Sequence, residues 1–154
     1  MKSLDALNIL NDLSASQQGV FTAAQARGLG IERLALSRLE AHGQIERIAH
    51  GVYRSCAAPS FREEDVWATW LALYPETPAW ERRRDGSQGA ASHNTAAWLL
   101  QLGELAPAPT TFTLPIRKQT RRSSMRLVKA PIRPEEVMTV KGIPTTVPTR
   151  TILD

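Results

Sequence analysis

The chain has 154 residues, of which 42% are hydrophobic and 22% are charged, and its formal net charge at pH 7 is +4. This length and composition fit a globular protein of one domain or two small ones. The sequence contains no apolar run near the length of a membrane-spanning helix, no signal-peptide core, and a single cysteine, Cys56. These features exclude an intramolecular disulfide and a cysteine-rich zinc site, and we expect a cytoplasmic protein without a membrane partner.

The first 58 residues predict three helices followed by a hairpin. Apolar residues at helical spacing, with glycines after them, predict helices over 3–18, 23–27 and 31–42, a short strand at 20–21, and two strands at 44–48 and 52–55. Ser3 and Thr22 are expected to cap the first two helices. This order is typical of a winged helix-turn-helix, in which the third helix enters the major groove and the hairpin lies along the flanking DNA. Residues 1–58 are therefore predicted to be a DNA-binding domain.

The third helix divides into an apolar face and a polar face. The apolar side carries Ile31, Ala35, Leu36 and Leu39. These residues are expected to pack against the first two helices, so the opposite side and the hairpin remain for base and phosphate contacts. The candidate DNA contacts of this domain are Thr22, Arg33, Ser37, Arg38, Arg47, His50 and Arg54.

These assignments have structural alternatives. The two arginines of the third helix could instead pair with nearby glutamates such as Glu32, Glu40 and Glu46. His50 could be only an exposed turn residue. Tyr53, in the second hairpin strand, is expected to fill the core with a solvated hydroxyl rather than to contact a ligand.

Residues 59–154 predict a small mixed α/β domain, so the whole chain is expected to be α+β. Helices are expected over 61–74 and 93–102 and from 150 onward, and strands at 111–114, 125–128, 137–140 and 143–147. Ser60 and Glu63 fit a capping box for the first of these helices, and Thr149 is expected to cap the last one. The last helix would stop inside its first turn at Asp154, so the domain looks truncated at its C-terminus.

Positive charge concentrates in the last part of the chain. Residues 93–154 carry nine Lys and Arg against four Asp and Glu, whereas residues 59–92 have a net charge of −2. A basic surface favours nucleic acid as the partner, although it can also serve solubility alone. The run Arg82-Arg83-Arg84 is more typical of a solvated loop. The candidate phosphate contacts of the second domain are Arg117, Lys118, Arg121 and Arg122.

The sequence offers no constellation of residues for catalysis. A metal nuclease needs carboxylates that converge on a cation, and none converge in the second domain. Ser92 and His93 are neighbours at the start of a predicted helix, where adjacent side chains point about 100° apart, so we do not expect them to form a catalytic pair. No phosphate-cradling glycine loop and no metal-ligand spacing is present. We therefore expect no enzymatic activity, no cofactor and no metal.

Two stretches of the sequence carry a family resemblance. The first runs from Gly19 to Arg54 and ends in His50-Gly51-Val52-Tyr53-Arg54. The second comprises Ser92-His93-Asn94-Thr95-Ala96-Ala97 together with Gly142-Ile143-Pro144-Thr145-Thr146-Val147-Pro148-Thr149-Arg150-Thr151. Many winged helices look like the first stretch, but the two stretches in this order are much more specific. In both, the chain resembles the AbiEi-like antitoxins of type IV toxin–antitoxin systems.

The resemblance implies a sequence-specific DNA-binding transcriptional autorepressor that binds inverted repeats upstream of its own operon. It also implies a C-terminal domain for antitoxin activity against a nucleotidyltransferase-like toxin, with or without direct contact between the two proteins. A single winged unit makes few base contacts, so tight binding would need a dimer, cooperative occupancy of two half-sites, or added backbone contacts from the second domain. The alternative function is a stand-alone winged-helix regulator whose second domain is a sensing or protein-interaction module.

Overall fold

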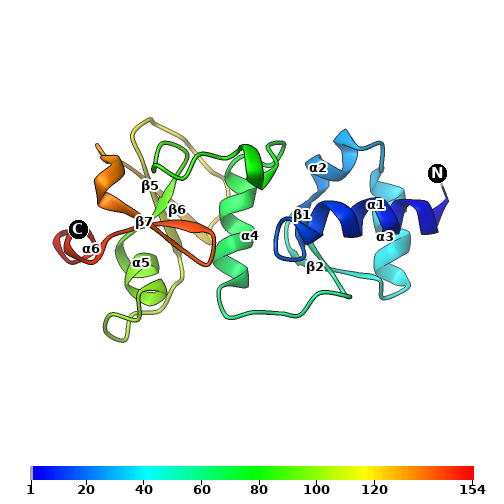
Figure 1. The fold of residues 1–154 in the computed structure, drawn as a ribbon, viewed down its shortest axis with the longest axis horizontal. Coiled ribbons are helices and arrows are strands. Elements are labelled where there is room, and N and C mark those ends of the chain that lie inside the picture. Colours follow the sequence, from blue (N-terminus) through cyan, green and yellow to red (C-terminus); the bar gives the residue numbers. More distant parts are fainter. Residues whose placement is uncertain (1) are drawn as a thin grey trace. The chain divides into compact units, whose positions relative to one another are not determined.

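The computed structural model describes residues 2–154 and divides into two compact units. The first unit ends at Arg82, and the second spans Arg83–Asp154. Over the described residues the protein is α+β, with six α-helices and two β-sheets (Figure 1). The fold class predicted from the sequence is confirmed at this level. None of the helices within residues 2–154 is long and apolar enough to cross a membrane.

The first unit has the predicted order of helices and strands. Its elements are α1 (Ser3–Ala15), β1 (Val20–Thr22), α2 (Ala23–Gly28), α3 (Arg33–Ala41), β2 (Ile45–Ala49), β3 (Val52–Ser55), α4 (Glu64–Leu73) and the 3-10 helix η1 (Ala79–Glu81). The three strands form an antiparallel sheet in the order β1-β3-β2. Gly19 and Gly51 occupy turns with φ angles of +83° and +72°, a region that glycine adopts without strain.

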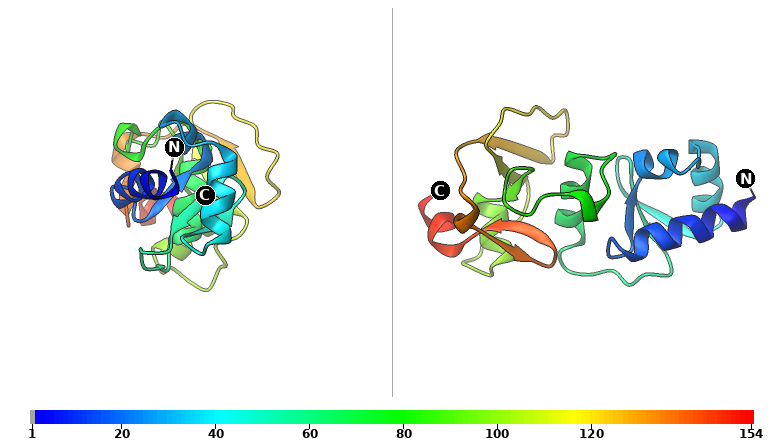
Figure 2. Two further views of the ribbon diagram at one scale, coloured as in Figure 1. Left: turned by 90° about the vertical axis from the view of Figure 1, so that its right-hand side faces the viewer. Right: turned by 45° about the horizontal axis from the view of Figure 1, so that its top comes forward.

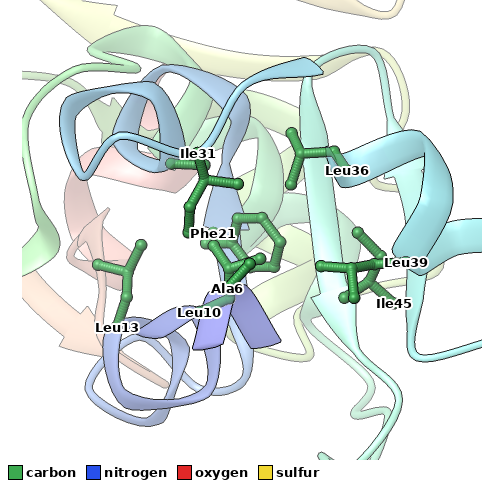
Figure 3. Packing of buried hydrophobic residues seen from close by; sticks show 9 residues of the cluster. Ala6, Leu10, Leu13, Phe21, Ile31, Leu36, Leu39 and Ile45 are labelled. Atoms are coloured by element: carbon green, nitrogen blue, oxygen red, sulfur yellow. The ribbon is translucent and has the colours of Figure 1, made fainter. Parts of the chain in front are cut away.

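The core of the first unit forms where α1, α3 and the sheet meet (Figure 3). Phe21 of β1 is fully buried and lies next to Leu10 of α1. Leu36 and Leu39 of α3 are also buried, which confirms the predicted apolar face of that helix. Tyr53 stacks on Phe21 with ring centroids 5.6 Å apart, so its predicted core role is confirmed.

Of the caps predicted for α1 and α2, only the cap of α2 is present. Thr22 accepts a hydrogen bond from the backbone N–H of Gln25, and the Gln25 side chain accepts one from the Thr22 N–H, both at 3.0 Å. This capping box fixes the start of α2. Ser3 does not cap α1, because that helix already includes Ser3 and its N-cap position is Lys2.

The helix α4 packs against β1 and β2, so the first compact unit is longer than the 58-residue domain expected from the sequence. The indole N–H of Trp67 donates to the Gln17 carbonyl at 2.8 Å. The expected capping box of Ser60 and Glu63 is wrong, because α4 begins only at Glu64 and the Ser60 hydroxyl donates to the Glu64 carboxylate instead.

The run of three arginines is not the solvated loop expected from its charge. Arg82 is buried, and its guanidinium lies 3.7 Å from the centre of a Trp70 ring. Its Nη1 also donates to the Trp70 carbonyl at 2.8 Å. Arg84 is half-buried, and burial lowers the pKa of its guanidinium. Only Arg83 is exposed as expected.

The second unit is built on a five-stranded mixed sheet. Its elements are β4 (Ala90–Ala91), α5 (His93–Leu99), β5 (Thr110–Leu114), β6 (Met125–Lys129), the 3-10 helix η2 (Pro134–Glu136), β7 (Val137–Val140), β8 (Ile143–Thr146) and α6 (Pro148–Leu153). The strand order is β6-β5-β4-β8-β7, with parallel pairing of β5 to β6 and of β4 to β8. The four predicted strands are confirmed, and the short β4 is an addition that completes the sheet.

The ends of the helices in the second unit differ from expectation. α6 begins at Pro148 with Val147 at its N-cap position, so Thr149 lies inside the helix rather than capping it.

The segment between β5 and β6, which holds the predicted basic loop, arcs away from the sheet (Figure 2). Of the cations in this segment, Arg117 and Arg121 are exposed, whereas Lys118 and Arg122 are half-buried.

Candidate nucleic-acid interface

The polar face of α3 carries two arginine side chains that form no ion pair within residues 2–154. Arg33, Ser37 and Arg38 are all exposed. Within residues 2–154, neither arginine has a carboxylate within the 4.0 Å of an ion pair. Glu46, one of the proposed competing partners, pairs with Arg54 instead. The alternative in which neighbouring glutamates neutralise this face is therefore not what the structure shows.

Side chains from α2, α3 and the β2–β3 hairpin surround one open cavity of about 480 Å³, here called the α2–α3–hairpin cleft. Four of the predicted DNA contacts line it, namely Arg33, Ser37, Arg47 and His50. Leu36 of α3 and Tyr53 of β3 also line it. The structure thus brings together residues that are up to 17 positions apart in the sequence, from Arg33 to His50.

The tip of the hairpin has a defined geometry. A bulge between Arg47 and Ala49 breaks the register of β2 on β3, and Gly51 completes the turn. The Arg47 Nη2 atom lies 3.1 Å from His50 Nδ1. Both side chains are exposed, so a cation and an imidazole stand together at the edge of the cleft.

The cleft also contains one cation that the sequence reasoning missed. Arg27, in the last turn of α2, is exposed and lines the same cavity. The sequence placed it at the end of a supporting helix, where only the folded structure reveals that it faces α3. Two carboxylates, Glu32 and Glu40, line the cleft as well. Three arginines and two glutamates give the cleft a weakly basic surface. Such a surface suits contacts with a few phosphates at fixed positions better than non-specific attraction of DNA.

Arg38 lies outside the lining of the cleft, although it is exposed on the same helix. It follows Ser37 by one residue, which turns it about 100° around the helix axis. The exposed surface of α3 is therefore wider than the cleft, and Arg38 extends it.

Two of the predicted contacts have other roles in the structure. Thr22 is 1% exposed, and its hydroxyl caps α2 and donates to the Pro75 carbonyl. Arg54 is held by Glu46 and by Glu64, whose Oε1 lies 3.0 Å from Arg54 Nε, and its Nη1 donates to the Ala58 carbonyl at 2.8 Å. Both side chains are engaged within the protein, and we leave both out of the proposed interface.

The four predicted phosphate contacts of the second unit are spread over the segment that follows β5. Arg117 and Lys118 line a cavity of about 230 Å³ together with Lys129 of β6. Arg121 is exposed and Arg122 is half-buried, and neither lines this cavity. The structure therefore groups one pair of the predicted phosphate contacts and leaves the other pair further along the arc.

Ser92 and His93 are closer than the sequence reasoning allowed. The Ser92 Oγ and His93 Nδ1 atoms are 2.9 Å apart, because His93 adopts a φ angle of +54° instead of the helical value assumed for it. Ser92 is fully buried and also accepts a hydrogen bond from Thr113 Oγ1 at 2.7 Å. These contacts tie the start of α5 to β5, which is a structural role.

The carboxylates with shifted pKa values lie outside the cleft. The backbone N–H of Arg133 and the guanidinium of Arg150 lower the pKa of Glu136. Hydrogen bonds from Ser87 lower the pKa of Asp85. Among residues 2–154, no three His, Cys, Asp or Glu side chains are grouped so that they could hold a metal ion. The titrating groups that stand out are thus parts of local structure.

The first unit therefore combines a short helical pair, an antiparallel hairpin and exposed arginines, a set typical of regulators that act on nucleic acid. Residues 8–55 match the family model described as "Transcriptional regulator, AbiEi antitoxin". The match runs from α1 to the end of β3 and confirms the family resemblance over this segment. Over these residues the chain is similar to AbiEi-type transcriptional regulators. A search of curated proteins found no match.

Proposed function

We propose that the chain is a sequence-specific DNA-binding transcriptional autorepressor that acts as the antitoxin of a type IV toxin–antitoxin system in the cytoplasm. In this proposal residues 1–58 act as a winged helix-turn-helix, and residues 59–154 act as the antitoxin domain against a nucleotidyltransferase-like toxin. The proposed DNA is the region upstream of its own operon, with inverted repeats. The observation that carries the proposal is the α2–α3–hairpin cleft, which lies in the segment matched by the regulator family.

The proposed binding mode follows from the dimensions of α3. A helix of nine residues is about 13 Å long, close to the ~12 Å width of the major groove. Arg38 and Ser37 would face base edges, where arginine can donate two hydrogen bonds to guanine. Arg33, Arg47 and His50 would contact phosphates on the flank, and Arg27 would add a contact from α2.

A helix this short contacts only a few base pairs, and one copy of the protein would therefore bind DNA weakly. Two copies on an inverted repeat would double the contacts, with half-sites about one helical turn or a multiple apart. Alternatively, Arg117, Lys118, Arg121 and Arg122 would add backbone contacts from the same molecule. The two possibilities differ in stoichiometry, since only the first needs two protein copies for each operator.

The test is binding of the full chain to its own upstream DNA and to a scrambled duplex of equal length, measured by fluorescence anisotropy over a series of salt concentrations. A preference for the upstream DNA that persists at physiological salt supports sequence-specific autorepression. Equal and steeply salt-dependent binding to both duplexes contradicts specificity, because released counterions would then account for the whole affinity. Absence of binding to either duplex contradicts the DNA-binding proposal.

Two variants separate base readers from phosphate contacts. Arg38→Ala is expected to cost about 1–3 kcal/mol on the upstream DNA and less on the scrambled duplex. The double variant Arg121→Ala/Arg122→Ala is expected to weaken both duplexes alike and to flatten the salt slope by about one unit per lost contact. Arg62→Ala is the control, because Arg62 lies outside the cleft and already pairs with Glu63 at 3.8 Å.

The antitoxin part of the proposal needs its own test. If residues 59–154 counter a nucleotidyltransferase-like toxin encoded in the same operon, coexpression of the chain with that toxin should restore growth. Growth arrest that persists despite normal DNA binding would favour the alternative function, a stand-alone regulator.

A further inference from the structure

A second cavity in the first unit lies away from α3. It is open, has a volume of about 710 Å³, and is bounded by α1, α2 and the segment 76–80. Apolar side chains dominate its lining, among them Ile9, Leu13, Leu29 and Trp80. Two of these are large and exposed, with 46% of Leu29 and 62% of Trp80 accessible to solvent. The volume falls within the ~300–1,000 Å³ of sites that bind small organic molecules.

The outer wall of this cavity is fixed by buried hydrogen bonds. The side chain of Gln17 accepts from the Ala79 N–H at 2.8 Å, and the side chain of Gln25 donates to the Thr77 carbonyl at 3.1 Å. The two glutamines are buried and also bond to each other, with Gln17 Nε2 donating to Gln25 Oε1 at 2.8 Å. Because buried amides of this kind are costly to leave unpaired, the wall is part of the native fold and the cavity is preformed.

The charges around the cavity are opposite in balance to those of the whole protein. Asp12 and Glu76 line it together with one cation, Arg27. All three side chains belong to exposed residues, and none of them forms an ion pair within residues 2–154. Two carboxylates against one guanidinium give this site a net negative charge, although the chain as a whole carries +4.

We infer that this cavity binds an apolar organic cation that carries aromatic rings. The apolar lining removes the rings from water. The face of the Trp80 indole attracts a positive charge, and the carboxylates of Asp12 and Glu76 add Coulomb attraction at the rim. Occupancy of this site can be measured without DNA, so its test does not depend on the proposed DNA interface.

Tetraphenylphosphonium and tetraphenylborate test the inference, since the two ions share size and shape and differ in the sign of their charge. Each is titrated into the full chain by isothermal calorimetry. We expect one tetraphenylphosphonium per chain, with an affinity at least tenfold above that of tetraphenylborate. Trp80→Ala should weaken tetraphenylphosphonium binding about tenfold, because the indole is lost.

The isosteric variant Asp12→Asn/Glu76→Gln should reduce the preference for the cation to less than threefold. Its matched control is Glu81→Gln, which removes an exposed carboxylate close in sequence that does not line the cavity. Circular dichroism melting verifies that each variant is folded. Equal affinity for the two ions overturns the inference, as does unchanged tetraphenylphosphonium binding in the double variant. Absence of binding to millimolar concentration in the wild-type chain overturns it too.

Discussion

Replacing Arg54 with alanine should destabilise the first unit and leave the salt dependence of DNA binding unchanged. The sequence suggested that Arg54 contacts phosphate, but in the structure its guanidinium serves three partners within the protein. It pairs with Glu46 and Glu64 and donates to the Ala58 carbonyl. The Arg54→Ala change therefore removes an internal tie between the hairpin and α4.

The magnitude follows from how exposed each partner is. The Glu46 side chain is 57% exposed, so that ion pair contributes at most about 1 kcal/mol. The Arg54 and Glu64 side chains are only 15% and 12% exposed. Removing one partner of a fully buried pair costs about 3–5 kcal/mol, and the residual solvent access here reduces that figure. We expect a loss of about 2–4 kcal/mol in the free energy of unfolding.

Urea unfolding followed by tryptophan fluorescence measures this loss, since Trp67, Trp70 and Trp80 all lie in the first unit. With a slope of about 2 kcal/mol per molar urea, the midpoint should fall by about 1–2 M. A double-mutant cycle with Glu64→Ala should give a coupling energy above about 1 kcal/mol. Arg62→Ala is the control and should change the stability by less than about 0.5 kcal/mol, because its ion pair is longer and more exposed.

The opposite pattern would refute this reasoning. If Arg54→Ala unfolds at the wild-type urea concentration and its DNA salt slope drops by about one unit, then Arg54 contacts phosphate. The internal network would in that case contribute nothing measurable.

Three further outcomes follow from local geometry. Gly19→Ala should lower the urea midpoint, because Gly19 has a φ angle of +83° and an added Cβ would lie 2.3 Å from the Ala58 Cβ. Gly28→Ala should be neutral or stabilising, because Gly28 lies in α2 with open space around it. Thr22→Ala should cost about 1 kcal/mol of stability through the lost cap without changing the DNA salt slope, as the same two assays will report. The folded state lowers the pKa of Glu136, so the ionised carboxylate stabilises the fold fully above the pKa of the unfolded chain, about 4.3, and less as the pH falls below that value. The stability difference between wild type and Glu136→Gln should therefore shrink in unfolding curves taken from pH 6 to pH 3.

The order of elements could be predicted because local signals agree with the fold. Glycines such as Gly19 and Gly51 mark turns that need positive φ, and the apolar spacing in α3 matches its buried face. The short β4 was missed because Ala90 and Ala91 have no strand preference of their own. Their strand exists only because β5 and β8 flank it. That pairing connects residues far apart in the sequence.

The residues of the candidate interface could be predicted only in α3, where helical periodicity determines which side chains are exposed. Arg33 and Ser37 follow from the periodicity of α3, and their position in the cleft agrees with it. The internal partners of Arg54 could not be predicted, because Glu64 approaches it from α4 through tertiary packing. The partners of His93 could not be predicted from helical spacing, because His93 has a positive φ angle and no feature of the sequence indicates one there.

Arg27 lies where the two proposed sites meet, because its side chain lines both the α2–α3–hairpin cleft and the cavity beside α1. Under both proposals, a phosphate bound in the cleft would attract this guanidinium and so reduce the positive charge beside Asp12 and Glu76. The cavity would then be more negative and would hold an organic cation more tightly. By thermodynamic linkage the cation strengthens DNA binding by the same factor, so under both proposals one arginine of α2 couples a small ligand to the operator without any movement of a helix.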